Sequence, residues 1–251
     1  GANGTYEFKV IDNAGNITTK TIEINNIDKT PPTLSLSQEP QGPTNKDVTI
    51  TANASDNFSG IKEIILPNGN KVTSNKATYK VDTNGTYTFK AIDNVGNITT
   101  ESITISNIDK VPPVITIEPY ETNWTNKNIT VKAKVDKGTL NKTSHTFTEN
   151  GSFEFVATDA AGNVAKKTVT ITNIDKIPPS KPKVERVEHR LVITPGTDNE
   201  SGIDKNVYSI NGGNWVTWNG DIDLSDFPDG NHTIKVRAID IAGNITETSL
   251  D

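Results

Sequence analysis

Aspartates recur at fixed places in this 251-residue chain, and carboxylates are side chains that bind hard cations. Asp93 and Asp240 occupy the same position in two copies of a repeated segment. Asp56 and Asp198 each begin a D-N-x-S-G-I sequence, and Asp109 lies before a pair of prolines. Because Ca²⁺ needs several oxygens together, these five aspartates are the predicted calcium ligands if they converge at one end of a folded unit. Alternatively, each aspartate caps the N–H groups of a turn, and no metal is needed.

Two tryptophans near the C-terminal end form a second candidate site, in the segment N-G-G-N-W-V-T-W-N-G. Glycan binding needs exposed aromatic rings with polar neighbours, so Trp215, Trp218 and Asn219 are the candidate ligand-binding residues. Positions three apart in a strand face opposite ways, so at most one ring belongs to the core unless a bulge intervenes. The other ring could bind a ligand or cover an edge of the core.

Catalytic chemistry has little support in the residue types. The chain has no cysteine, which excludes thiol nucleophiles and cysteine-bound zinc. His145, His189 and His232 lie in no nucleophile or metal-ligand motif, and we expect His145 and His232 to be solvated beside turns. Catalytic groups are rarely copied in every unit of an array. We therefore predict that the chain is no enzyme, although it could be the accessory region of a larger secreted enzyme.

The charge balance limits the partners. The formal net charge is −6, and no stripe of lysine and arginine appears, so nucleic acid is not an expected partner. No apolar run is long enough to span a bilayer, so we expect no membrane insertion. A monomer is expected.

A repeated phrase organises the whole chain. It occurs at Asn3–Thr19, Asn84–Thr100, Asn150–Lys166 and, more loosely, His232–Thr248, and three copies continue into N-I-D-K-x-P-P. The repeated aspartate recurs after 81, 66 and 81 residues, which is near the lower size limit of independently folding domains. We therefore predict a first module at 30–110, a middle module at 111–176 and a divergent third module at 177–251. We expect residues 1–29 to be the C-terminal hairpin of a truncated immunoglobulin-like module.

The pattern within a module indicates β-structure. Tyr87, Phe89 and Ala91 alternate with polar residues, which is typical of a half-buried strand, and the A-x-D-x-x-G-N turn that follows predicts a hairpin. The expected strands of the first module are Thr33–Ser37, Asp47–Ala54, Ile61–Leu66, Lys71–Thr73, Ala77–Val81, Thr86–Ile92 and Ile98–Ser106. About seven short strands with regular turns are the pattern of an immunoglobulin-like β-sandwich.

These motifs resemble the bacterial immunoglobulin-like (Big-type) repeats of secreted and cell-wall-anchored proteins, mainly of Gram-positive bacteria. The resemblance rests on the A-x-D-x-x-G-N hairpins, the D-K-x-P-P linkers and the D-N-x-S-G-I loops, and the middle module departs from it because it has no such loop. The resemblance implies an all-β fold of tandem sandwiches joined by Pro-Pro linkers, on the bacterial cell surface or secreted. It also implies that Trp215 is the packed tryptophan.

The combined prediction is an extracellular, non-catalytic stalk that holds a partner domain away from a cell or an enzyme core. The alternative is an adhesin or glycan-binding module that recognises host glycan or matrix protein through the third module. No cofactor is required by either hypothesis, although calcium is possible.

Overall fold

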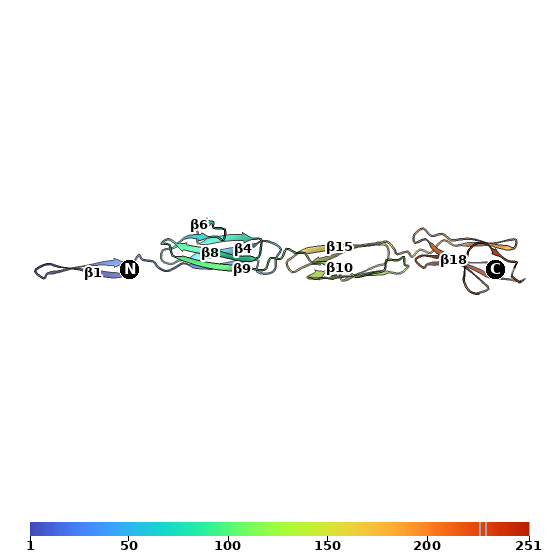
Figure 1. Cartoon of the computed structure of the whole chain (residues 1–251), viewed down its shortest axis with the longest axis horizontal. Coiled ribbons are helices and arrows are strands. Elements are labelled where there is room, and N and C mark those ends of the chain that lie inside the picture. Colours follow the sequence, from blue (N-terminus) through green and yellow to red (C-terminus); the bar gives the residue numbers. More distant parts are fainter. Residues whose placement is uncertain (226, 229, 251) are drawn as a thin grey trace. The chain divides into compact units, whose positions relative to one another are not determined.

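The computed structural model describes all residues except 226, 229 and 251. The described residues form strands and loops without a helix, and every ladder between the named strands is antiparallel (Figure 1). The prediction of an all-β fold is confirmed. No helix in the described part of the chain could cross a membrane.

The chain divides into two compact units. One contains Gly1–Val111 with Ala160–Asn163, and the other contains Pro112–Asp159 with Val164–Asp251. Among the described residues, the first unit holds one hydrophobic core and the second unit holds two, in the middle and third modules.

Two sheets enclose the core of the first module. One is ordered β3 (Thr33–Glu39), β4 (Val48–Ser55), β7 (Lys76–Val81), and the other β6 (Lys71–Val72), β5 (Ile61–Ile65), β8 (Gly85–Asp93), β9 (Ile98–Ile105). All seven expected strands are present, and their ends differ from the expected ends by at most two residues. The prediction succeeds because alternate residues face the core: Val48, Ile50 and Phe89 are fully buried, while their neighbours are not.

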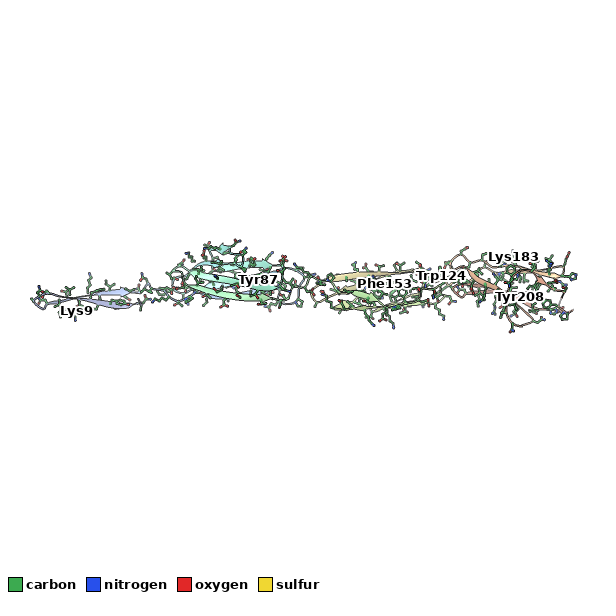
Figure 2. All side chains as sticks on the ribbon, viewed as in Figure 1. Lys9, Tyr87, Trp124, Phe153, Lys183 and Tyr208 are labelled. Carbon is green, nitrogen blue, oxygen red and sulfur yellow. The ribbon has the colours of Figure 1, made fainter. Side chains whose placement is uncertain are left out.

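The middle module has a similar plan with one strand fewer among the described residues. Its sheets are β10 (Ile115–Ile117), β11 (Ile129–Val135), β13 (Ser144–Phe147), and β12 (Thr139–Leu140), β14 (Gly151–Thr158), β15 (Val164–Ile171). Phe153 packs against this core as Tyr87, its counterpart in the repeated phrase, packs against the first core (Figure 2). His145 stacks on Phe153 with ring centroids 3.9 Å apart, so the expectation of a solvated His145 is wrong. The ring buries apolar area against its aromatic neighbour.

The third module again has two sheets around a core. They are β16 (Lys183–Val187), β17 (Arg190–Thr194), β20 (Ile222–Asp223), and β19 (Val216–Thr217), β18 (Ile203–Ile210), β21 (Ile234–Asp240), β22 (Ile245–Leu250). Lys183–Val187 is the strand that the sequence predicts.

The hairpin of β1 (Gly4–Ile11) and β2 (Ile17–Ile24) stands without further strands among the described residues. Its apolar side chains remain exposed, including Phe8, which is 58% exposed, whereas the equivalent Phe89 is 0% exposed.

Candidate functional site

The repeated hairpin turn is held by its own aspartate. Asp93 Oδ1 accepts N–H bonds from Gly96 at 2.7 Å and Asn97 at 2.8 Å, and Oδ2 accepts the Asn97 side-chain amide at 2.7 Å. Burial raises the pKa of Asp93, but these hydrogen bonds outweigh it and the pKa lies below its ordinary value. Gly96 has a φ of 100°, which L-residues with a side chain rarely adopt. The turn-capping interpretation of this aspartate therefore describes what its oxygens do.

In the first and third modules, the hairpin aspartate also belongs to a set of three carboxylates. Asp28, Asp56 and Asp93 each place one oxygen within 4.8 Å of the others. Both Asp56 and Asp93 were among the predicted ligands, but Asp28, from the linker before the module, is the third member. The predicted Asp109 lies elsewhere, because it follows the far end of β9, where its N–H donates to Thr44 O at 2.9 Å. An antiparallel strand of eight residues separates it from the hairpin turn.

The third module repeats this arrangement. Its set contains the two predicted aspartates, Asp198 and Asp240, and again a preceding linker aspartate, Asp175. Asp175 is fully buried, and its Oδ2 accepts the N–H of Ser201 at 3.1 Å. Burial raises the pKa of Asp175, and its hydrogen bonds, with those involving Ser201 the first among them, lower it further than burial raises it.

The spacing of the oxygens in each set is compatible with one bound cation such as Ca²⁺. Two oxygens that share one ion at about 2.4 Å lie at most about 4.8 Å apart, and the three carboxylate oxygens of each set meet that limit. Among the described residues, no lysine or arginine forms an ion pair with any of the six carboxylates. In addition, Asp28 Oδ2 is buried and has no hydrogen-bond partner in the described part of the chain. Unneutralised carboxylates at this spacing repel one another, and a cation would remove that repulsion.

The middle module differs at the same place. It has no D-N-x-S-G-I loop, and its hairpin aspartate, Asp159, instead forms an ion pair with Lys137, with Lys137 Nζ 3.2 Å from Asp159 Oδ2.

The linkers are bound by asparagine side chains of the module that precedes them. The Asn84 amide donates to Ile108 O at 2.8 Å and accepts the Ile108 N–H at 3.0 Å, and Asn150 forms the same pair with Ile174 at 2.9 and 2.8 Å. The sequence assigned these asparagines only to turns, because Asn-Gly is a common turn sequence. Their recurrence 24 residues before each linker isoleucine is the signal that could have revealed the contact.

A second segment supports the linker in each module. Thr125 pairs with Ile174 in an isolated parallel bridge, as Thr44 does with Ile108. Both threonines begin the tripeptide T-N-K, a repeat that the sequence interpretation missed.

The following module binds the linker from the other side. Asn244 of the third module donates its side-chain amide to Asp175 O at 3.0 Å, and Thr246 Oγ1 donates to Pro179 O at 2.6 Å. Asn97 donates in the same way to Asp28 O at 3.5 Å, and Thr99 to Pro32 O. Each of these two linkers therefore accepts hydrogen bonds from the module that follows it.

One tryptophan packs against the core and the other is partly exposed, in the reverse of the order that the resemblance implies. Trp218 packs against the third core and its Nε1 is buried without a hydrogen-bond partner among the described residues. Trp215, which the resemblance implied to be packed, is 37% exposed and lies under the Arg237 guanidinium, 3.9 Å from its ring centroid. The assignment is reversed because Trp218 continues the β19 pairing, with its N–H donated to Asn206 O at 2.9 Å, while Trp215 precedes that strand. Asn219 is exposed.

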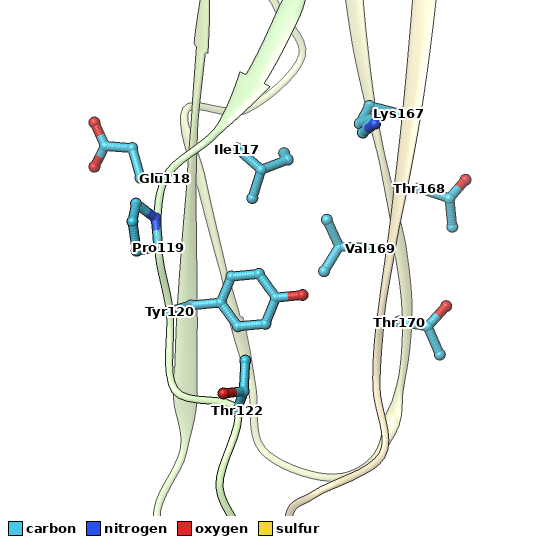
Figure 3. Close-up of a pocket in the computed structure, with 9 residues that line it drawn as sticks. All are labelled: Ile117, Glu118, Pro119, Tyr120, Thr122, Lys167, Thr168, Val169 and Thr170. Carbon is cyan, nitrogen blue, oxygen red and sulfur yellow. The ribbon is translucent and has the colours of Figure 1, made fainter.

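An open cleft of about 500 Å³ lies in the middle module between the segment after β10 and the edge strand β15 (Figure 3). Ile117, Tyr120 and Val169 point into it, while Thr168 and Thr170 point away. These three apolar side chains belong to or pack against the module's own core. The cleft is therefore the open seam between two sheets.

No protein-family model matches the chain, and no curated protein matches it. Among solved structures, it is similar to a tetra-tandem repeat in the extending region of a large adhesion protein. That alignment covers 98% of this chain and 81% of the other, at 18% sequence identity and a TM-score of 0.33. These values are too low to transfer fold or function to this chain.

Proposed function

We propose that the chain is a non-catalytic spacer region of an extracellular bacterial protein, built from tandem immunoglobulin-like β-sandwiches joined by Pro-Pro linkers. Its role is to hold a partner domain at a defined distance from a cell surface or from the catalytic core of a secreted enzyme. The observation that supports this proposal is the two-sided attachment of the linker, by Asn150 and Thr125 on one side and by Asn244 on the other.

The physical reason is the cost of bending. A linker without contacts would leave neighbouring modules free to reorient. Here, swinging the third module away from the linker would break the bonds from Asn244 and Thr246, and each hydrogen bond contributes about 1 kcal/mol. A few such bonds limit the population of bent states by one to two orders of magnitude, since about 1.4 kcal/mol corresponds to a factor of ten.

Calcium binding at the two carboxylate sets is the second part of the proposal. Asp28 and Asp175 come from the linkers, whereas the other four aspartates come from a loop and a hairpin of the following module. A bound Ca²⁺ would offset two of the three negative charges and link the carboxylates electrostatically. The linker would thereby be fixed to the module that follows it, which adds to the attachment by Asn97 or Asn244.

The adhesin hypothesis has less support from the same residues. A glycan-binding platform needs an exposed ring, and Trp218 instead covers the third core. Trp215 offers one face at most, because Arg237 lies over its ring and is itself paired with Glu247 at 2.7 Å.

Distance measurements between spin labels test the spacer proposal directly. The chain has no native cysteine, so Lys132→Cys and Lys183→Cys give two unique attachment sites, on exposed positions of the middle and third modules. We expect a narrow distance distribution that broadens on Asn150→Ala or Asn244→Ala. Asn214→Ala, an exposed asparagine in a loop, is the matched control and should leave the distribution narrow. A distribution that is already broad without any of these substitutions would overturn the proposal.

A further inference from the structure

The loop that supplies one carboxylate to each set is shortened in the middle module. In the first module the chain passes from β4 to β5 through five residues, Asp56–Gly60. In the middle module it passes from β11 to β12 through three residues, Asp136–Gly138. Two residues are missing, and the residue after the loop aspartate is lysine instead of asparagine.

The short loop lies directly against the hairpin strand. Gly138 has a φ of 83°, and a Cβ at this position would lie 2.3 Å from Thr158 O and 2.7 Å from Asp159 Cα. Only glycine permits this approach. The loop aspartate is used elsewhere, because Asp136 Oδ1 accepts the N–H of Val114 at 2.7 Å and of Lys137 at 2.8 Å.

This backbone position directs the Lys137 ammonium onto the hairpin carboxylate. Lys137 Nζ lies 3.2 Å from Asp159 Oδ2, and the Asp159 side chain is only 3% exposed. Of the four hairpin aspartates, Asp12, Asp93, Asp159 and Asp240, only Asp159 is ion-paired within the described residues. The module that lacks the third carboxylate is thus also the module that supplies a positive charge from its own chain.

We propose that Lys137 is a tethered cation that takes the place of Ca²⁺ in the middle module and excludes the ion from it. The hairpin turn Asp159–Asn163 is therefore independent of calcium, whereas Asp93–Asn97 and Asp240–Asn244 respond to it. This inference rests on the calcium part of the proposed function. Its consequence is that calcium acts on alternate modules, because an ammonium beside a carboxylate both neutralises it and repels a divalent ion.

Hydrogen–deuterium exchange of the whole chain, with Ca²⁺ and with a chelator, tests this proposal. On chelation we expect Asp93–Asn97 and Asp240–Asn244 to exchange at least about tenfold faster, and Asp159–Asn163 to keep its rate. A calcium response at Asp159–Asn163 would overturn the role of Lys137 but leave the calcium proposal standing. If no turn responds, the calcium proposal fails, and with it the role of Lys137 as a substitute for the ion.

Substitutions of Lys137 provide a second test of this proposal. Lys137→Gln leaves a buried carboxylate without its counter-charge, so Asp159–Asn163 should exchange about tenfold faster at any calcium concentration. Lys137→Arg keeps the charge and should retain most of the protection. Unchanged exchange in the β11 and β14 core shows that the variants are folded. Equal protection of this turn in Lys137→Gln and the unaltered chain would contradict the proposal.

Discussion

Hairpins β1–β2 and β8–β9 have nearly the same sequence and the same register, but among the described residues only the second packs on a hydrophobic core. Tyr6 pairs with Ile22 as Tyr87 pairs with Ile103. The turns also agree, since the hairpin aspartate of each accepts the N–H of the asparagine four residues later at 2.8 Å. Turn and register are therefore encoded locally, by short-range hydrogen bonds. Burial of the apolar face instead depends on distant strands, which in the described part of the chain are present for the second hairpin.

Removing the central phenylalanine ring should give the largest difference in stability loss between the two hairpins. Phe89→Ala should lower the free energy of unfolding of the first module by about 3–5 kcal/mol, because it leaves a cavity in a fully buried site. Phe8→Ala, at the equivalent exposed position, should change stability by less than about 0.5 kcal/mol. Chemical denaturation of both variants measures the difference. Similar losses from both would mean that β1–β2 is covered in solution.

Calcium should stabilise the first module but not the turn of β1–β2, because Asp12 belongs to no carboxylate set among the described residues. At a concentration a hundredfold above its Kd, a ligand adds about 2.7 kcal/mol. Asp28→Asn should abolish this gain while keeping the acceptor for the Thr30 N–H. Without calcium, the same variant should be at least as stable as the unaltered chain, because one repulsive charge is gone. Calorimetry with and without a chelator measures the gain in stability from calcium. A full gain in Asp28→Asn would contradict the assignment of Asp28 as a calcium ligand.

Removing the asparagine side chain that binds the linker should also destabilise the β8–β9 module more than the β1–β2 hairpin, but by a smaller amount than removing the phenylalanine. Asn84→Ala removes two hydrogen bonds to Ile108 that are partly buried, which should cost about 2 kcal/mol. Asn3 makes the same pair with Ile27 at an exposed position, so Asn3→Ala should cost much less, since water replaces the lost bonds. Asn84→Asp retains the acceptor and loses the donor, so it should cost less stability than Asn84→Ala. Equal costs of the two alanine variants would show that burial does not strengthen the contact.

The pKa values of Asp12 and Asp93 should show the smallest difference between the two hairpins, because both turns make the same hydrogen bonds to their aspartate. The pKa of Asp12 is lowered below its ordinary value of 3.8, chiefly by the Asn16 side-chain amide. The pKa of Asp93 is also lowered, although burial opposes the shift. A carboxyl whose folded pKa is depressed stabilises the fold above its unfolded pKa, and this contribution is lost as pH falls through the folded pKa. NMR titration should find both groups below 3.8; a value at or above it for either would refute the turn geometry.

Much of the fold could be predicted because the strands alternate in polarity and end at recognisable turns. Lys183–Val187 is correct even in the divergent third module. The placement of Asp109 was wrong because a repeat in sequence does not show at which end of a strand a linker residue lies. The convergence of Asp56 with Asp93 could be anticipated, whereas the contribution of Asp28 depends on the fold of a linker that carries no strand pattern.

The missed residues have a common cause. Lys137 acts through a loop whose path depends on the close approach of Gly138 to Thr158, and Thr125 acts through an isolated bridge to the distant Ile174. The packed role was assigned to Trp215 instead of Trp218. Alternation shows that two side chains face opposite ways but does not show which of them faces the core.

The linker contacts described above have a genetic consequence. Asn84, Asn150, Asn244 and Thr246 all bind main-chain atoms of the linker. The variable residue of D-K-x-P-P is threonine at 30, valine at 111 and isoleucine at 177, and all three residues are exposed. The linker side chains that the joint does use, such as Ile174 and Asp175, belong to the repeated N-I-D-K-x-P-P sequence, so the joint does not need to co-evolve with the variable residue. Copies of such a module can therefore be duplicated or lost by recombination within the gene, and the array can change its number of modules without a new joint having to be selected.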